Sequence, residues 1–516
     1  MDTPSPLEVQ VSSSIQVFPE LRQADQVIVP LSIIDNTVSY FARCSGIWFY
    51  DPPSNQESAL SSGELQTSLS KTLQSYRPWC GRLSYAKPIP KGGHTNRYRR
   101  VHVTYNAPTD LGVTLITATS PKKLSDFIPS VQDRKSALKA WDASQIDSGG
   151  LLPKTQMALA SPPPPPDAPN CIIQFTTFAC GSSSIAIALA HGLSDAQSMC
   201  TFAKDWASTN RALHASAPLP NLSPVLNPRL LDAAALGDID AEDPDQSLIS
   251  QARNLPLHRF DWYKQVPGYG DNTPSDFDHS AVLSPSDPIP WNDWDMTAPS
   301  AGRVLHFTPD EIQLIYEQAS TDPSSKISKH DAILAHVWAL VNRARQLPSG
   351  TVTYLDLTFG LRPRLSLPQN FLGSPIMLAA IPWTISATIP SLSSIAANIR
   401  THLATFTPQA IGAFLHDAAF EYSPQRLWQA FLGSKHILQT TWAQSGFQDV
   451  DFIGEGGGNL MYVQPEMGGD GLLLVMEALG EKKGQWTANG VDVHLYLNRE
   501  VMERFLKDPN LWGEGV

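Results

Sequence analysis

Residues 171–206 read CIIQFTTFACGSSSIAIALAHGLSDAQSMCTFAKDW, and this stretch decides the fold. Residues 171–178 and 185–190 each alternate with a period of two, which is typical of β-strands, and Cys180-Gly181-Ser182 between them predicts a hairpin turn. The residues after Asp195 recur at helical spacing and define one inner face, made of Met199, Phe202, Ala203 and Trp206. The stretch therefore predicts a strand hairpin followed at once by a helix.

His191 lies at the junction between the second strand and this helix. The period of two places it on the same face as the large apolar residues of the strand, and Gly192 then ends the strand. Asp195 or Ser194 can cap the helix that follows. An imidazole at the end of a buried strand is partly desolvated, neutral and oriented, as a general base must be. His191 and Asp195 are therefore the leading candidates for a catalytic site.

The spacing His-x-x-x-Asp is weak evidence when taken alone. The chain has 13 histidines, so chance supplies roughly one such match. His306 and Asp310 form a second match, but Asp310 is explained as an acidic residue in the first turn of a helix. The alternative is that His191 is purely structural, a buried histidine beside an aspartate that caps a helix. The position of His191 between the strand and the helix argues against this alternative.

Length and composition restrict the class of protein. A chain of 516 residues is too long for one ordinary core and predicts two domains, or three. A net charge of -12 argues against nucleic acid or an anionic membrane as the main partner. The five cysteines form no CxxC pair, which argues against a disulfide framework or a zinc site. The sequence has no secretion signal and no long apolar run, so we expect a cytoplasmic protein.

The chain divides into two halves that both mix strands and helices. We expect an N-terminal domain at residues 1–218, a crossover linker rich in Pro, Asp, Ser and Asn at 219–302, and a C-terminal domain at 303–516. The linker is expected to have little regular structure, and the prolines at 162–166 predict a stiff spacer. In the second half, helices are expected to begin at Thr308 and Ser328, and strands at 352–359, 376–385, 449–453, 460–463, 472–477 and 491–496.

Three other patterns offer alternatives. Gly192-Leu-Ser194-Asp-Ala196 is similar to the G-x-S-x-G turn of serine hydrolases, with Asp449 or Asp451 and His494 following in the right order, but Ala196 replaces the last glycine. The glycines at 454–458 form either a phosphate-binding loop or, as we favour, a hairpin or a kinked loop. A pair of arginines, Arg362 and Arg364, either grips a phosphate or carboxylate or forms a buried ion pair.

The sequence resembles the BAHD acyltransferases, which move acyl groups from coenzyme A to alcohols and amines. Residues 172–198, IIQFTTFACGSSSIAIALAHGLSDAQS, resemble the central block of that family. The proline-rich connection and the insertions are most similar to fungal O-acetyltransferases of the trichothecene type. Five further blocks also resemble the family and stand in the family's order, two before the central block and three after it. They are PLSIIDN at 30–36, ELQTSLSKTLQSYRPWCGRL at 64–83, ISKHDAILAHVWALVNRAR at 327–345, TFGLRPRLSLPQNFLG at 358–373 and TTWAQSGFQDVDFIGEG at 440–456.

The sequence departs from the family pattern at two places. Ala196 stands where the family usually has glycine, and the DFGWG block is reduced to Asp451-Phe-Ile-Gly454-Glu. Peptide-synthetase condensation domains, which share the fold, carry a second histidine where this chain has Ala190. The DFGWG block is structural in the family, so its alteration here puts the geometry of that loop in doubt more than the chemistry of the site.

The resemblance implies an α/β protein of two chloramphenicol-acetyltransferase-like domains with mixed sheets, joined by a long crossover loop, with a channel between them. His191 would be the general base in that channel, and Thr440, with Trp442 nearby, would stabilise the oxyanion. Asp195 would be structural and pair with an arginine, Arg362 being the best candidate. The residues expected to shape the site from nearby are Gly192, Arg362, Asp451, Phe452 and Gly454.

The resemblance also implies the reaction and its partners. Acyl-CoA, with acetyl-CoA as the default, would be the co-substrate, and a hydroxyl of a small secondary metabolite would be the acceptor. No metal and no bound cofactor are implied, nor a nucleic acid or membrane partner, and we expect a monomer. Two other functions stay open: a serine hydrolase that uses Ser194, and a non-catalytic binding protein with the same fold.

Overall fold

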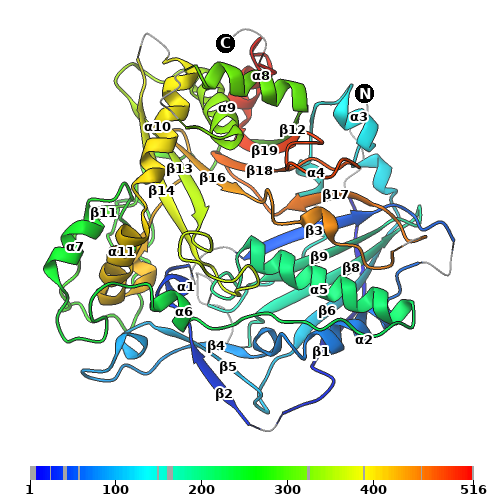
Figure 1. Cartoon of the computed structure of the whole chain (residues 1–516), viewed down its shortest axis with the longest axis horizontal. Coiled ribbons are helices and arrows are strands. Elements are labelled where there is room, and N and C mark those ends of the chain that lie inside the picture. Colours follow the sequence, from blue (N-terminus) through cyan, green and yellow to red (C-terminus); the bar gives the residue numbers. More distant parts are fainter. Residues whose placement is uncertain are drawn as a thin grey trace.

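The computed structural model describes residues 7–23, 25–38, 43–55, 59–147, 150–159, 167–321, 326–386, 390–454 and 456–513. The protein is built from two large mixed sheets that lie one above the other in Figure 1, each with helices on its outer side. Both halves of the chain mix strands and helices, as predicted. The proline run at 162–166 lies outside the described residues.

The first large sheet holds the hairpin that precedes His191. Its strands β8 and β9 pair antiparallel and join through the predicted turn at Cys180, while β6 and β8 run parallel. Every residue of β9 is buried, so both faces of the sheet are covered at that point. In spatial order the six strands are β1 (Gln10–Val17), β6 (Val113–Ser120), β8 (Cys171–Phe178), β9 (Ser183–Leu189), β3 (Cys44–Tyr50) and β17 (Leu460–Pro465).

The second large sheet also combines parallel and antiparallel pairs. β16 lies between β13 and β18 and is parallel to both, whereas the other neighbouring strands are antiparallel. In spatial order the seven strands are β14 (Ile376–Thr384), β13 (Val352–Gly360), β16 (His436–Thr441), β18 (Leu472–Glu477), β19 (Val491–Asn498), β12 (Ser300–Phe307) and β7 (Ala140–Trp141).

Helices cover the outer face of each sheet (Figure 1). The helices α2 (Ser62–Thr72) and α5 (Ala196–His214) pack on each other against the first sheet. The long α9 (Lys329–Arg345) contacts α8 (Pro309–Ala319), α10 (Leu392–Ala404) and α12 (Arg499–Leu506) over the second sheet. The remaining helices are α1 (Ile33–Thr37), α3 (Val131–Lys135), α4 (Ser144–Asp147), α6 (Arg229–Asp232), α7 (Gln246–Arg253) and α11 (Pro408–Phe420).

Each half of the chain contributes one edge strand to the large sheet of the other half. β17, from the C-terminal half, pairs with β3 at the edge of the first sheet, and β7, from the N-terminal half, pairs with β12 at the edge of the second. A cluster of buried side chains joins the two sheets here and includes Phe49, Phe178, Val304 and Tyr462. The domain boundaries at 218 and 303 stay a prediction, but the two halves are interlocked rather than merely tethered.

The crossover segment has little regular structure, as its composition predicts, apart from a few short elements. Asp245 caps the eight-residue helix α7 through the backbone N–H groups of Ser247 and Leu248. The segment also supplies β11 (Asp287–Pro288) and β10 (Phe260–Asp261), which form a small sheet with β15 (Leu427–Trp428). A separate small sheet in the N-terminal half is formed by β2 (Val27–Pro30), β5 (Val101–Tyr105) and β4 (Arg82–Tyr85). The expectation of little regular structure in the crossover segment is confirmed, because its short elements are separated by turns and irregular backbone.

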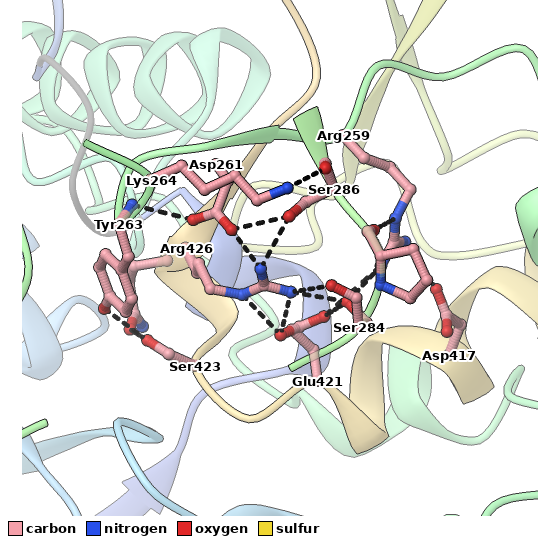
Figure 2. A network of polar contacts seen from close by, with 12 residues as sticks. Arg259, Asp261, Tyr263, Lys264, Ser284, Ser286, Asp417, Glu421, Ser423 and Arg426 are labelled. Carbon is pink, nitrogen blue, oxygen red and sulfur yellow. Dashed lines mark hydrogen bonds and ion pairs between the residues drawn. The ribbon is translucent and has the colours of Figure 1, made fainter. Parts of the chain in front are cut away.

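Buried charges fasten this segment to the C-terminal half. Arg426, which is fully buried, contacts Asp261 of β10 and lies 2.8 Å from Glu421 (Figure 2). Arg259 reaches Asp417 at 2.8 Å in the same network. Because a charge buried away from water needs a partner, these pairs hold the crossover segment in one position.

Most elements expected in the second half are present, with one error. The helices begin after Thr308 and Ser328, each with a complete capping box, and five of the six expected strands form. The sixth, at 449–453, is wrong: a short 3₁₀ turn at Phe447–Asp449 is followed by irregular backbone. The side chain of Asp451 accepts hydrogen bonds from the backbone N–H groups of Ile453 and Gly454. These N–H groups are therefore not available for hydrogen bonds to a neighbouring strand.

Candidate functional site

The turn that carries His191 and Asp195 closes the gap between β9 and α5. Asp195 is the N-cap of α5, and its Oδ1 accepts the backbone N–H of Ser198 at 2.9 Å. Within the turn, the N–H of Ser194 donates to the carbonyl of His191 at 3.2 Å. The strand, the turn and the capped helix therefore fix the imidazole as the sequence predicts.

Asp195 forms the predicted ion pair with Arg362. Nη1 of Arg362 lies 2.5 Å from Oδ2 of Asp195, and Nη2 lies 2.9 Å from Oδ1, a two-pronged contact. The two residues are 5 % and 4 % exposed. Nη2 also donates to the carbonyl of Phe371 at 2.8 Å. The carboxylate is thus occupied in joining α5 to the loop after β13, and Arg362 is not available to grip a phosphate.

A serine that sequence analysis did not identify contacts His191. Ser374 Oγ lies 3.0 Å from Nδ1 of His191 and also donates to the carbonyl oxygen of His191. Since the hydroxyl proton goes to that carbonyl, the serine oxygen accepts the Nδ1–H, which leaves Nε2 as the basic nitrogen. The two residues are 183 positions apart, so no local pattern could reveal this contact.

The backbone of Ser374 is itself held in place. Its N–H donates to Oδ1 of Asp35 at 2.6 Å, and the preceding carbonyl, of Gly373, accepts the N–H of Asp195 at 2.9 Å. Burial raises the pKa of Asp35 to about 7. The loop at 371–374 is therefore clamped against the His191 turn from both sides.

Burial determines the charge of His191. Loss of solvent lowers the pKa of its imidazole, and the nearby negative charge of Asp195 only partly offsets this effect. The net shift is downward from the ordinary value of 6.5. His191 is therefore neutral near pH 7, with Nε2 unprotonated and able to take a proton.

The structure places Thr440 and Trp442 at the end of β16. Thr440 is half-buried and pairs with Leu474 of β18. The indole of Trp442 stacks on Phe447, with ring centres 4.3 Å apart, and belongs to the same buried cluster as Met199 of α5. Trp442 thus packs the C-terminal half against the helix that follows His191, and the oxyanion role of Thr440 stays a prediction.

The degenerate block at Asp451, Phe452 and Gly454 braces α5. The ring of Phe452 meets the indole of Trp206 edge-on at 4.8 Å, and its carbonyl accepts a hydrogen bond from Asn210 at 2.9 Å. Gly454 has a φ of 91°, which favours glycine and matches a kinked loop. The block supports the site from outside and contacts neither His191 nor Asp195 among the contacts recorded for the described residues.

The geometry does not favour the hydrolase alternative. Ser194 is fully buried, and its hydroxyl donates to the carbonyl of Asp195 at 3.0 Å. His494 lies in β19, stacked on Tyr462, and both Asp449 and Asp451 are exposed. The nucleophile, base and acid of that hypothesis are thus held apart by separate elements.

One group of side chains in the described part of the chain has the composition of a metal site. It consists of His258, Asp356 and His436, whose ligand atoms lie within 4.8 Å of one another. None of the three was singled out by sequence analysis, since they come from three distant segments. In the same described ranges, no helix is both long and apolar enough to cross a membrane.

Comparison with known proteins identifies the family. The Transferase family matches residues 7–511. An acyltransferase of Alternaria alternata, AFT15-1, is 27% identical over 98% of this chain and 97% of its own length, and acyltransferase abl6 of Leptosphaeria maculans is 25% identical over 98% of both. Among solved structures, F. sporotrichioides TRI101 complexed with coenzyme A and T-2 has a TM-score of 0.62 at 17% identity, covering 94% of this chain and 98% of that one.

Vinorine synthase has a TM-score of 0.59 at 17% identity and covers 96% of both chains. These structural similarities show the two-domain α/β fold of chloramphenicol-acetyltransferase-like enzymes, as the sequence predicts. Together with the match over nearly the whole chain, they establish that this chain is an acyltransferase enzyme that belongs to the BAHD branch of the Transferase family.

Proposed function

We propose that the protein transfers an acyl group, with acetyl as the preferred group, from acyl-CoA to a hydroxyl of a small secondary metabolite. The observation that carries this proposal is the environment of His191: Ser374 accepts the Nδ1–H, which makes Nε2 the basic nitrogen of the imidazole. Relatives named acyltransferases, and solved structures of the same fold bound to coenzyme A with T-2 or deoxynivalenol, support the substrate classes.

In the proposed reaction, Nε2 of His191 takes the proton of the acceptor hydroxyl as its oxygen attacks the thioester carbonyl. Base catalysis of this kind contributes roughly 10² to 10⁴ in rate. The hydroxyl of Thr440 donates to the negative oxygen of the tetrahedral intermediate. The C–S bond then breaks, the thiolate of coenzyme A leaves, and it takes the proton back from His191. The products are the ester and free coenzyme A, with no acyl-enzyme.

Asp195 and Ser374 have positioning roles in this proposal. Asp195 pairs with Arg362 and caps α5, so it fixes the turn without touching the substrates. Ser374 selects the tautomer of His191. Ser374→Ala is expected to lower kcat about tenfold with little change in KM for acyl-CoA, because orientation of the base affects the transition state more than ground-state binding.

The proposal is tested with purified protein, acetyl-CoA and a panel of hydroxylated secondary metabolites that includes deoxynivalenol, read by mass spectrometry. We expect a product heavier by one acetyl group and an equal amount of free coenzyme A. His191→Ala is the control and should form this product roughly 10² times more slowly or slower still. Hydrolysis of acetyl-CoA without transfer to any alcohol would contradict the proposal, as would full transfer by the His191→Ala variant.

The donor and the assembly state need separate measurements. A comparison of acetyl-CoA with longer acyl-CoA thioesters should give the highest kcat/KM for acetyl, and a higher value for a longer chain would correct the acyl group alone. Light scattering during size-exclusion chromatography should give the mass of a single 56.4 kDa chain, and twice that mass would contradict the expected monomer.

A further inference from the structure

Three residues from separate segments meet in the C-terminal half, away from the His191 turn. Nε2 of His258, in the crossover segment, lies 3.1 Å from Oδ1 of Asp356 in β13. Nδ1 of His436, the first residue of β16, lies 2.9 Å from Oδ2 of the same carboxylate. Asp356 is fully buried, His436 nearly so, and the side chain of His258 is 12% exposed.

The carboxylate of Asp356 has an unusual set of partners for a buried acid. In the described part of the chain, its ion-pair partners are the two histidines, with no lysine or arginine among them. Within the same described ranges, one further hydrogen bond reaches this carboxylate: the backbone N–H of Phe431 donates to Oδ2 at 2.9 Å. A buried carboxylate between two imidazoles is also a familiar set of ligands for a divalent transition metal.

The distances are compatible with an ion in the middle of the group. A tetrahedral zinc ion with bonds of about 2.0–2.1 Å separates its ligand atoms by roughly 3.4 Å. Both nitrogen–oxygen distances are already near that value. All the ligand atoms lie within 4.8 Å of one another, so the two imidazole nitrogens need to approach by at most about 1.4 Å.

The surroundings supply the remaining parts of a metal site. The Phe431 N–H orients the carboxylate, as outer partners of metal ligands usually do. The rings of Phe260 and Tyr354 stack on His258 and His436, at 4.5 and 5.2 Å, and form an apolar wall. His258 also lines a cavity of about 50 Å³, which is large enough to hold a water molecule and borders the group on the His258 side, since Asp356 and His436 do not line it.

We propose that His258, Asp356 and His436 bind a divalent transition metal ion of the zinc class. The ion accepts electron pairs from Nε2 of His258, Nδ1 of His436 and the carboxylate, with a water molecule as fourth ligand. The protons that the two nitrogens donate to Asp356 in the empty site move to the other ring nitrogen or to solvent. No oxidation or reduction takes place.

Such an ion would be structural rather than catalytic. It would tie the crossover segment, through His258, to two neighbouring strands of the second sheet, since β13 and β16 are paired. Binding to the folded chain stabilises it, and at a free-ion concentration of 100 times Kd the equilibrium constant for folding rises about 100-fold. The inference is independent of the acyl-transfer reaction proposed above.

The test uses the full-length protein with any affinity tag removed, stripped by a chelator and dialysed. Zinc is then added, and bound metal is measured by mass spectrometry of the elements. We expect about one zinc ion per chain and a higher melting temperature than for the stripped protein. Cobalt in place of zinc should give the visible absorption bands of a four-coordinate site. Less than a tenth of an ion per chain, with no thermal shift, would overturn the proposal.

A conservative variant separates metal binding from simple hydrogen bonding. Gln at position 258 can still donate an N–H to Asp356 but is a poor metal ligand, so His258→Gln should fold, keep the melting temperature of the stripped wild type and lose the zinc-dependent shift. His279→Gln, at an exposed position of the same crossover segment, should keep the full shift. An unchanged shift in His258→Gln would place the zinc elsewhere and refute the assignment.

Discussion

At the scale of single residues, His191 is the side chain whose loss should cost most activity. His191→Ala is expected to lower kcat by roughly 10² or more, because the acceptor hydroxyl then has no base. The protein should stay folded, since Asp195 rather than His191 caps α5 and pairs with Arg362. Circular dichroism and initial rates measure both effects. Ser194→Ala, in the same turn, should be nearly silent, and near-wild-type rates in His191→Ala would refute the mechanism.

The pH dependence of activity should report the desolvation of His191. The base works in its neutral form, and burial lowers the pKa of the imidazole below 6.5. Therefore kcat/KM should be constant near neutral pH and fall only as the pH drops through that lowered pKa. A profile of kcat/KM from pH 4.5 to pH 8 measures this. An acid limb centred above pH 7 would mean that the base is stabilised as a cation.

Asp195 should affect stability as well as rate. Asp195→Asn removes the charge that Arg362 needs and leaves a guanidinium buried without a counter-charge. Breaking a buried pair from one side costs about 3–5 kcal/mol of unfolding free energy. Chemical denaturation measures the loss, with Asp449→Asn, at an exposed position, as the control. A fully stable Asp195→Asn protein with low activity would instead make the carboxylate a direct partner of His191.

Some residues of the site could be predicted from sequence and others could not. The pairing of Asp195 with Arg362 was expected because the two blocks that carry them recur in the family. Ser374 and Asp35 were not, because their contacts with the His191 turn depend on how distant loops meet, and a serine or an aspartate in a loop has many other uses. The same holds for His258, which reaches Asp356 from the crossover segment.

At the scale of secondary structure elements, the sequence predicts helices and strands correctly where capping residues and hydrophobic periodicity indicate the same element. Thr308 and Ser328 each begin a helix with a capping box, and β18 runs from Leu472 to Glu477 as expected. The strand expected at 449–453 failed because Asp451 turns its side chain onto the following backbone. An alternation of apolar and polar residues does not show that a side chain competes with a neighbouring strand for the backbone N–H groups.

The crossover segment should depend on Arg426 for its stability. Arg426→Met fills a similar volume but leaves Asp261 and Glu421 buried without their cation (Figure 2). We expect a loss of about 3–5 kcal/mol in unfolding free energy, measured by urea denaturation. Lys264→Ala, an exposed neighbour in the same network, should change it by less than about 0.5 kcal/mol. Equal stabilities for the two variants would contradict the argument.

At the scale of the whole molecule, the kinetic order follows from direct transfer. Both substrates must be bound together, so initial-rate plots at varied acyl-CoA and acceptor should intersect, and intact-mass spectra with acyl-CoA alone should show no adduct. Cys200, on the helix that follows His191, is a poor nucleophile, because burial raises its pKa to about 12 and its thiol contacts the Ser445 carbonyl at 3.0 Å. Parallel plots with a stable adduct would replace direct transfer by a ping-pong scheme.

The exchange of β7 and β17 between the two sheets constrains how this chain can be recombined with its relatives. A chimera joined at the crossover segment would combine a β3 edge from one parent with a β17 from the other, and a β12 edge with a foreign β7. Both strand pairings carry buried side chains that must fit: Phe49 and Tyr462 between β3 and β17, and Trp141 and Val304 between β7 and β12. A chimera that takes only one half of the chain from each parent therefore mismatches both of these strand pairs. A functional hybrid requires that residues 140–141 and 460–465 come from the same parent as the sheet to which each segment belongs.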